Sequence, residues 1–261
     1  FRHALMREAA YQLHPPADRA ALHKLALEVL EQLLSPEALS ELAEELADHA
    51  ADAQAAAADT TEARDLARRQ VRYLIQAGEN AAARYEADGA VSLLTRAAQH
   101  PQCDEASRFR ALVAAGNTRI VEGRFEPARQ LLQQVNPDSL GAADRAAWRL
   151  RMAEVDLRTA RYPQVLQLAA LAVQDARSVG HGAFEARALA MQASANMLAG
   201  RLDEALVQYE ETLALAQAVG DAAAAAQAEV NRASVLRKRG RHTEAEAILR
   251  RALTEFAKAG P

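Results

Sequence analysis

The amino-acid sequence predicts an all-α protein, a right-handed superhelix of stacked antiparallel helix pairs. Half of its 261 residues are hydrophobic but only 4% are aromatic, and Ala and Leu, both strong helix formers, supply most of the apolar content. Glycine and proline are sparse, at 11 and 8 residues. A short residue theme also recurs at nearly constant spacing, which indicates a repeat protein.

The theme begins with glycine or a small residue, places a bulky residue two positions later, and ends on a small residue. We expect the first helix of each pair to end at the glycine, which adopts positive φ without strain. The closing small residue lets the second helix approach the first. The first repeat lacks the glycine and is one residue short, and the third repeat has Ala160 in place of the glycine. The theme ends at Ala90, Ala128, Val165, Ala205 and Ala245, which are 38, 37, 40 and 40 residues apart.

The N-terminal third is helical but less regular. We expect one helix from Phe1 to about His14, a break at Pro15-Pro16, and a second helix from Asp18 to Leu34. A third begins at Ser35-Pro36-Glu37, where a capping hydroxyl, a first-turn proline and an acid coincide, and runs to about Ala57. The next starts at Thr60-Thr61-Glu62. Residues 1–69 thus form one helical region, and 70–261 about five repeats.

The stretch from Gly200 to Ala205, followed by Tyr209 and Leu213, resembles the tetratricopeptide repeat, as do the units ending at Ala128 and Ala245. The resemblance covers roughly residues 70–260. It implies that the first helices line an inner surface that binds a protein or peptide. Val113 stands where the chaperone-type clamp of this family would have a lysine beside Asn117.

A second resemblance involves the N-terminal region. Phe1-Arg2-His3-Ala4-Leu5, Arg7, Ala10-Tyr11, Arg19, Leu22-His23, Ala26, Asp48-His49-Ala50 and Tyr73-Leu74-Ile75-Gln76-Ala77-Gly78-Glu79 are similar to the segment that links an ATPase core to helical repeats. The parents are bacterial multidomain signalling ATPases: LuxR-type or maltose-regulator-like transcription factors, and ATPase-fused cyclases and kinases. This implies that residues 1–69 follow an upstream ATPase core and that the repeats are a cytoplasmic sensor or docking arm. The alternative is a stand-alone repeat scaffold in an unrelated system.

The sequence lacks the common motifs for nucleotide binding and metal binding. It has no Gly-x-x-x-x-Gly-Lys or Gly-x-Gly-x-x-Gly loop, and the histidines lack ligand spacing, so we expect no nucleotide, cofactor, metal site or enzymatic activity. Cys103, the single cysteine, is expected to be unreactive. A net charge of −4 and few aromatics argue against nucleic acid, and charges interrupt every apolar run, so no membrane span is expected. Two basic clusters, Arg149-Arg151-Arg158-Arg161 and Arg237-Lys238-Arg239 with Arg241, are interpreted as solvated faces.

The candidate binding residues are those that the tetratricopeptide register places on the inner surface of the first helices. Amides and guanidinium groups can pair with carbonyls and carboxylates, and methionine adapts to apolar side chains. The sequence therefore predicts an acidic or amphipathic peptide as partner. The residues are Arg110, Asn117, Glu154, Arg158, Arg187, Met191, Ser194, Met197, Asn231, Ser234, Arg237 and Lys238, with Val121 beside the first two.

Overall fold

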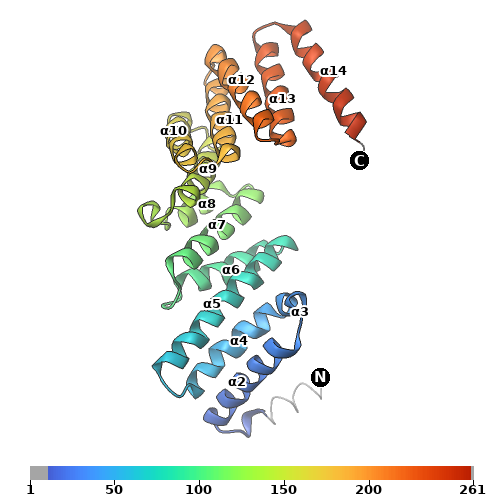
Figure 1. Cartoon of the computed structure of the whole chain (residues 1–261). Helices are drawn as coiled ribbons and strands as arrows, with labels where there is room; N and C mark the ends of the chain where they lie inside the picture. The colour runs from blue at the N-terminus through green and yellow to red at the C-terminus, as the bar shows by residue number, and fades with distance from the viewer. Residues whose placement is uncertain (1–10, 260–261) are drawn as a thin grey trace. The chain divides into compact units, whose positions relative to one another are not determined.

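The computed structural model describes residues 11–259, and in this part of the chain it contains thirteen α-helices, α2 to α14, and no strand (Figure 1). The all-α class is confirmed. Most of the helix expected from Phe1 to His14, and the N-terminal likeness up to Ala10, lie outside the described residues. Within the described range, every helix is too short or too polar to cross a bilayer.

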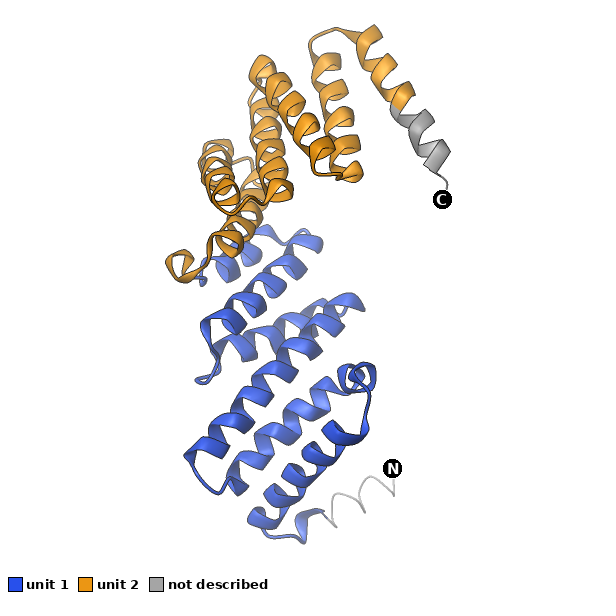
Figure 2. Ribbon diagram, in the orientation of Figure 1, with its two compact units in different colours: residues 1–135 blue, residues 136–261 orange. Residues whose placement is uncertain are grey.

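Two compact units make up the chain (Figure 2). Unit 1 holds α2 (Pro16–Leu33), α3 (Pro36–Glu41), α4 (Ala43–Ala53), α5 (Thr60–Ala83), α6 (Ala87–Gln99), α7 (Glu105–Val121) and α8 (Phe125–Leu132). Unit 2 begins at Asn136 and holds α9 (Ala142–Arg158), α10 (Tyr162–Ser178), α11 (Gly182–Leu198), α12 (Leu202–Ala218), α13 (Ala222–Lys238) and α14 (His242–Ala259). Short 3₁₀ helices lie at Gln54–Ala56 and Pro137–Ser139. The boundary expected between residues 69 and 70 falls inside α5.

Consecutive helices pack as antiparallel neighbours within each unit, from α4 to α8 and from α9 to α14. The five predicted pairs are α5 with α6, α7 with α8, α9 with α10, α11 with α12, and α13 with α14. Helix α2 adds a further layer against α4.

The single helix expected from Ser35 to about Ala57 is wrong. Ser35 does cap its start, since its side chain accepts a hydrogen bond from the Ala38 amide, but the helix breaks at Leu42 into α3 and α4. The amide of Asn80 donates to the Ser40 carbonyl at 2.6 Å, an oxygen that a continuous helix would offer to residue 44. This tertiary bond favours the break.

Left-handed residues end the helices that lead into the turns. Five are glycines: Gly123, Gly180, Gly200, Gly220 and Gly240, with φ from +66° to +81°. Tyr85 and Ala160 adopt the same conformation, at φ +62° and +58°. The next amide then bonds the carbonyl five residues back, as Arg201 does to Asn196 and Arg161 to Asp156, both at 2.8 Å; this is the Schellman motif.

The first repeat, α5 with α6, is therefore complete, and the expectation that it is one residue short is wrong. Tyr85 takes the place of the glycine, and Ala90 follows it by five residues, as Ala205 follows Gly200. The predicted close helix contacts are confirmed, because the small residues that end the five themes are all buried. Ala205, for example, packs with Ala193, Tyr209 and Val235.

Candidate functional site

The first helices of the pairs pack against one another within each unit. In unit 1, α5 contacts α7, and in unit 2, α11 contacts both α9 and α13. Their side chains that face away from the second helices are not needed for stacking within a pair. We call this face the inner face of each unit, and the predicted binding residues lie on its helices.

Arg187 is a partly buried cation on the inner face of unit 2. It is half-buried on α11, and it forms no hydrogen bond or ion pair with any residue that the structure describes. Burial, and then the neighbouring charge of Arg151, lower the pKa of Arg187 below its ordinary value, while Glu154 and Asp221 oppose that shift. A guanidinium held out of water without a direct counter-charge can form charge-assisted hydrogen bonds with an anion.

The other predicted binding residues of unit 2 lie on α9, α11 and α13. Met191 and Met197 are partly buried against the core. Glu154 receives a hydrogen bond from Arg151 at 3.0 Å. Arg158, Arg237 and Lys238 are exposed at the ends of their helices.

Three other predicted binding residues use their polar groups within the chain. Ser194 Oγ lies 2.8 Å from the hydroxyl of the buried Tyr209 and donates to the Ala190 carbonyl. Ser234 donates to the Val230 carbonyl of its own helix, and Asn231 Oδ1 accepts from Gln227. The serine hydroxyls are therefore largely committed to the fold, whereas the Asn231 amide nitrogen keeps its donors.

On unit 1, the two predicted residues of α7 have different surroundings. Arg110 makes a bidentate pair with Glu79 of α5, at 2.7 and 2.6 Å. Asn117 lines a hollow of about 560 Å³ between α5 and α7, with exposed Val121 and Tyr85 also in its lining. Arg110 is thus already neutralised, while Asn117 and Val121 border space that a ligand can enter.

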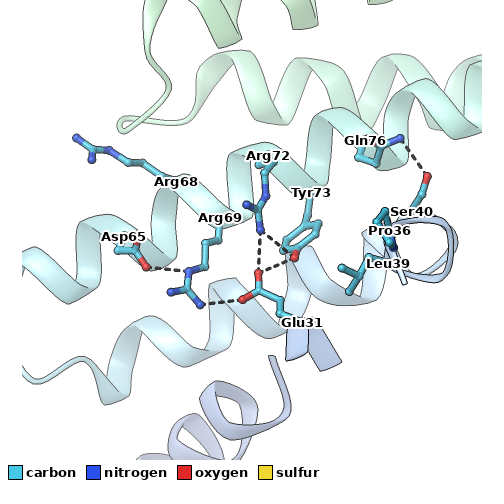
Figure 3. A pocket seen from close by; sticks show the side chains of 10 residues that line it. All are labelled: Glu31, Pro36, Leu39, Ser40, Asp65, Arg68, Arg69, Arg72, Tyr73 and Gln76. Carbon is cyan, nitrogen blue, oxygen red and sulfur yellow. Dashed lines mark hydrogen bonds and ion pairs between the residues drawn. The ribbon is translucent and has the colours of Figure 1, made fainter. Parts of the chain in front are cut away.

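A second cavity, of about 720 Å³, lies in unit 1 between α2, α3 and α5 (Figure 3). Three arginines of α5 line it, Arg68, Arg69 and Arg72, and we call it the arginine pocket. Glu31 of α2 lies among them: Arg69 Nη1 and Arg72 Nη2 donate to its carboxylate at 3.0 and 2.8 Å, and the Tyr73 hydroxyl donates at 2.5 Å.

The arginine pocket was missed from the sequence, although a signal for it exists. Arg72 lies thirteen residues before the left-handed Tyr85, as Arg110 and Arg187 lie thirteen before Gly123 and Gly200. Because Tyr85 is not a glycine, the sequence theme does not mark the turn of the first repeat, and the predicted surface does not include α5.

The basic clusters are largely neutralised. Arg149 and Arg145 both pair with the buried Asp175, and Arg151 pairs with Glu154. Arg239 pairs with Asp203, and Arg241 with Glu244.

Among the described residues, no group of three or more His, Cys, Asp or Glu side chains could hold a metal ion. Cys103 is buried, which raises the pKa of its thiol.

Comparison with known proteins shows the fold. No family model and no curated protein matches the sequence. Among solved structures, the TPR-like repeats of a putative kinesin light chain from Podosopora anserina are 17% identical, with a TM-score of 0.62 over 73% of this chain and 96% of that one. Aspartyl phosphate phosphatase F from Bacillus subtilis is 13% identical, with a TM-score of 0.68 over 94% and 71%. A Rap protein complexed with competence and sporulation factor is 14% identical, with a TM-score of 0.62 over 98% and 74%. The chain therefore has a tetratricopeptide-like repeat fold.

Proposed function

We propose that this chain is a non-catalytic repeat domain that binds a protein or peptide on its inner face. The observation that carries the proposal is Arg187, a half-buried cation with no ion pair among the described residues. Keeping such a group out of water costs free energy unless a partner supplies an acceptor. A carboxylate of a bound peptide supplies one, and Met191 nearby adapts to an apolar side chain of the same peptide.

The similar structures support binding and leave catalysis open. The Rap protein is complexed with a factor, while another similar protein is named a phosphatase. An enzyme requires titratable groups that converge on one point. The described inner face of unit 2 instead offers spread-out cations and methionines. In the arginine pocket of unit 1, where titratable groups do converge, they are hydrogen bonded to one another through Glu31. Both arrangements favour binding over catalysis.

The test of binding is a triple variant. A partner segment is first identified by capture, and its affinity is measured by calorimetry with Arg158, Arg187 and Asn231 all changed to Ala. We expect binding to weaken by about 1–3 kcal/mol for each desolvated charged contact. The control changes Arg177, Gln174 and Arg250, exposed residues of second helices, to Ala. Loss of affinity in the control but not in the inner-face variant would contradict the proposal.

We further propose that the domain is the sensor or docking arm of a cytoplasmic bacterial signalling ATPase, such as a transcription regulator. The support is the likeness of Leu22-His23, Asp48-His49-Ala50 and the α5 stretch from Tyr73 to Glu79 to the linking segment of such proteins. The gene sequence upstream of Phe1 tests this: a Gly-x-x-x-x-Gly-Lys loop is expected there. Without an ATPase sequence, the alternative of a stand-alone scaffold stands.

A further inference from the structure

We propose that the arginine pocket of unit 1 binds a carboxylate of an acidic peptide segment, and that Glu31 occupies part of this cradle in the free chain. The proposal rests on the proposed function only in taking the ligand to be a peptide. The pocket lies in unit 1, whereas the proposed binding groups tested above belong to unit 2. The two sites can therefore be tested separately.

Glu31 shows which chemistry the cradle accepts. Its carboxylate is only 20% exposed and receives three donors, from Arg69, Arg72 and Tyr73. Burial, and then the bond to Glu31, raise the pKa of Tyr73 to about 12, so its hydroxyl stays protonated and donates at neutral pH. Two guanidiniums and a phenol around one carboxylate form a charge-assisted site.

Donors remain after Glu31 is bound. Arg72 uses Nη2 for both of its hydrogen bonds, and 63% of its side chain is exposed. Arg68 is exposed and makes no hydrogen bond or ion pair within the described part of the chain, although its charge helps to lower the pKa of Asp104 after the bonds to Ser107. Arg68 and the outer donors of Arg72 can therefore hold a second acceptor.

The charge of the lining selects a carboxylate over a phosphate group. Three arginines face two acids, Glu31 and Asp65, so the lining carries one net positive charge. A single carboxylate neutralises that charge, whereas a phosphate dianion leaves a negative excess. Two carboxylates of an acidic segment are accommodated when one of them displaces Glu31.

The rest of the pocket fits a peptide better than a lone ion. Pro36 and Leu39 supply an apolar wall, and Gln76 and Ser40, hydrogen bonded to each other at 3.1 Å, supply amide and hydroxyl groups (Figure 3). The volume of about 720 Å³ lies within the range of about 300–1,000 Å³ that is usual for ligand pockets. A side chain and part of its backbone fit in this space.

The experiment measures binding of a fluorescein-labelled hexaglutamate peptide to the full chain by fluorescence anisotropy at low salt, with hexaglutamine as the neutral comparison. Arg68→Gln and Arg72→Gln are each expected to weaken binding roughly tenfold, as expected for loss of a charged hydrogen bond. Glu31→Gln is expected to tighten it several-fold, because Arg69 and Arg72 lose the negative charge of their internal counter-ion and Tyr73 keeps only a neutral acceptor. Arg96→Gln, an exposed arginine of α6 outside the lining, is the matched control.

The gain of affinity in Glu31→Gln is the decisive readout, because a damaged fold does not produce it. Equal affinity of Glu31→Gln and the unaltered chain overturns the proposal, as does a loss in Arg96→Gln as large as in Arg68→Gln. Stronger competition by inorganic phosphate than by glutarate overturns the choice of a carboxylate. The Arg158, Arg187 and Asn231 triple variant should keep the part of hexaglutamate binding that depends on Arg68 and Arg72, because these two arginines lie in unit 1. The pocket proposal is refuted, and the proposed function supported, by one combination of results. In it, Arg68→Gln, Arg72→Gln and Glu31→Gln bind hexaglutamate like the unaltered chain, while the triple variant loses affinity for its partner segment.

Discussion

Ala160→Gly should stabilise the protein, although it removes a methyl group and adds flexibility to the unfolded chain. Ala160 has φ +58°, and a left-handed conformation costs an L-residue about 1–2 kcal/mol. Glycine removes that strain but loses about 0.5–1 kcal/mol of backbone entropy on folding. Because Ala160 is exposed, the missing methyl costs little burial. The net expected gain is about 0.5–1 kcal/mol.

Urea unfolding followed by circular dichroism measures this gain. With a denaturant slope of about 3 kcal/mol per M, the midpoint should rise by about 0.2–0.3 M. Gly200→Ala is the reverse test: an added Cβ at Gly200 (φ +81°) meets no atom within 4 Å, so only backbone strain lowers the midpoint. Ala214→Gly, at an exposed site inside α12, should instead cost about 1 kcal/mol. A lower midpoint for Ala160→Gly would refute the reasoning.

Four further outcomes are expected. Ala205→Leu should overpack the α11–α12 contact and cost about 1–3 kcal/mol in thermal melting; an unchanged melt would mean that the register is wrong. Gly116→Ala places a Cβ 2.9 Å from Leu132, and urea titration should show that this clash outweighs the gain of about 1 kcal/mol in helix propensity. Asp175→Asn should cost about 3 kcal/mol in the same titration, because it leaves Arg145 and Arg149 without their shared carboxylate. Burial, and then the charge of His23, lower the pKa of His49 below 6.5, so stability should fall as pH drops below 6.5 and fall less in His49→Gln.

The turns and the helix pairs could be predicted from the sequence because their causes are local. A left-handed residue, a bulky residue two positions later and a small residue five positions later all lie within one short window, as at Gly200, Leu202 and Ala205. The turn of the first repeat is the exception, because Tyr85 adopts a left-handed conformation that its own side chain does not favour.

Tertiary partners decided what the sequence could not show. The break at Leu42 depends on Asn80, which lies 38 residues away in the chain, and Arg110 is neutralised by Glu79 of another helix. The arginine pocket depends on Glu31 reaching Arg72 across 41 positions. Helical periodicity tells which face a residue occupies, but not which charge lies opposite to it.

The same register position carries an arginine in the pocket of unit 1 and on the inner face of unit 2. Arginine occurs thirteen residues before the left-handed turn residue in three of the five pairs, at Arg72, Arg110 and Arg187. Arg72 is paired with Glu31 and Arg110 with Glu79, so this position attracts carboxylates within the chain itself. Arg187 has no such pair among the described residues, and the equivalent positions of α9 and α13 are the uncharged Ala147 and Gln227.

The three arginines should therefore differ in what they contribute to binding. A partner carboxylate at Arg187 forms a new ion pair without breaking one, whereas at Arg72 it has to share the site with Glu31 or displace it. At Arg110 the carboxylate of Glu79 already holds the guanidinium in a bidentate pair, through Nε and Nη2. Changing Arg187 alone should then lower the affinity for an acidic partner more than changing Arg110 alone. In a chain that lacks the Glu79 carboxylate, the difference between these two losses of affinity should be smaller.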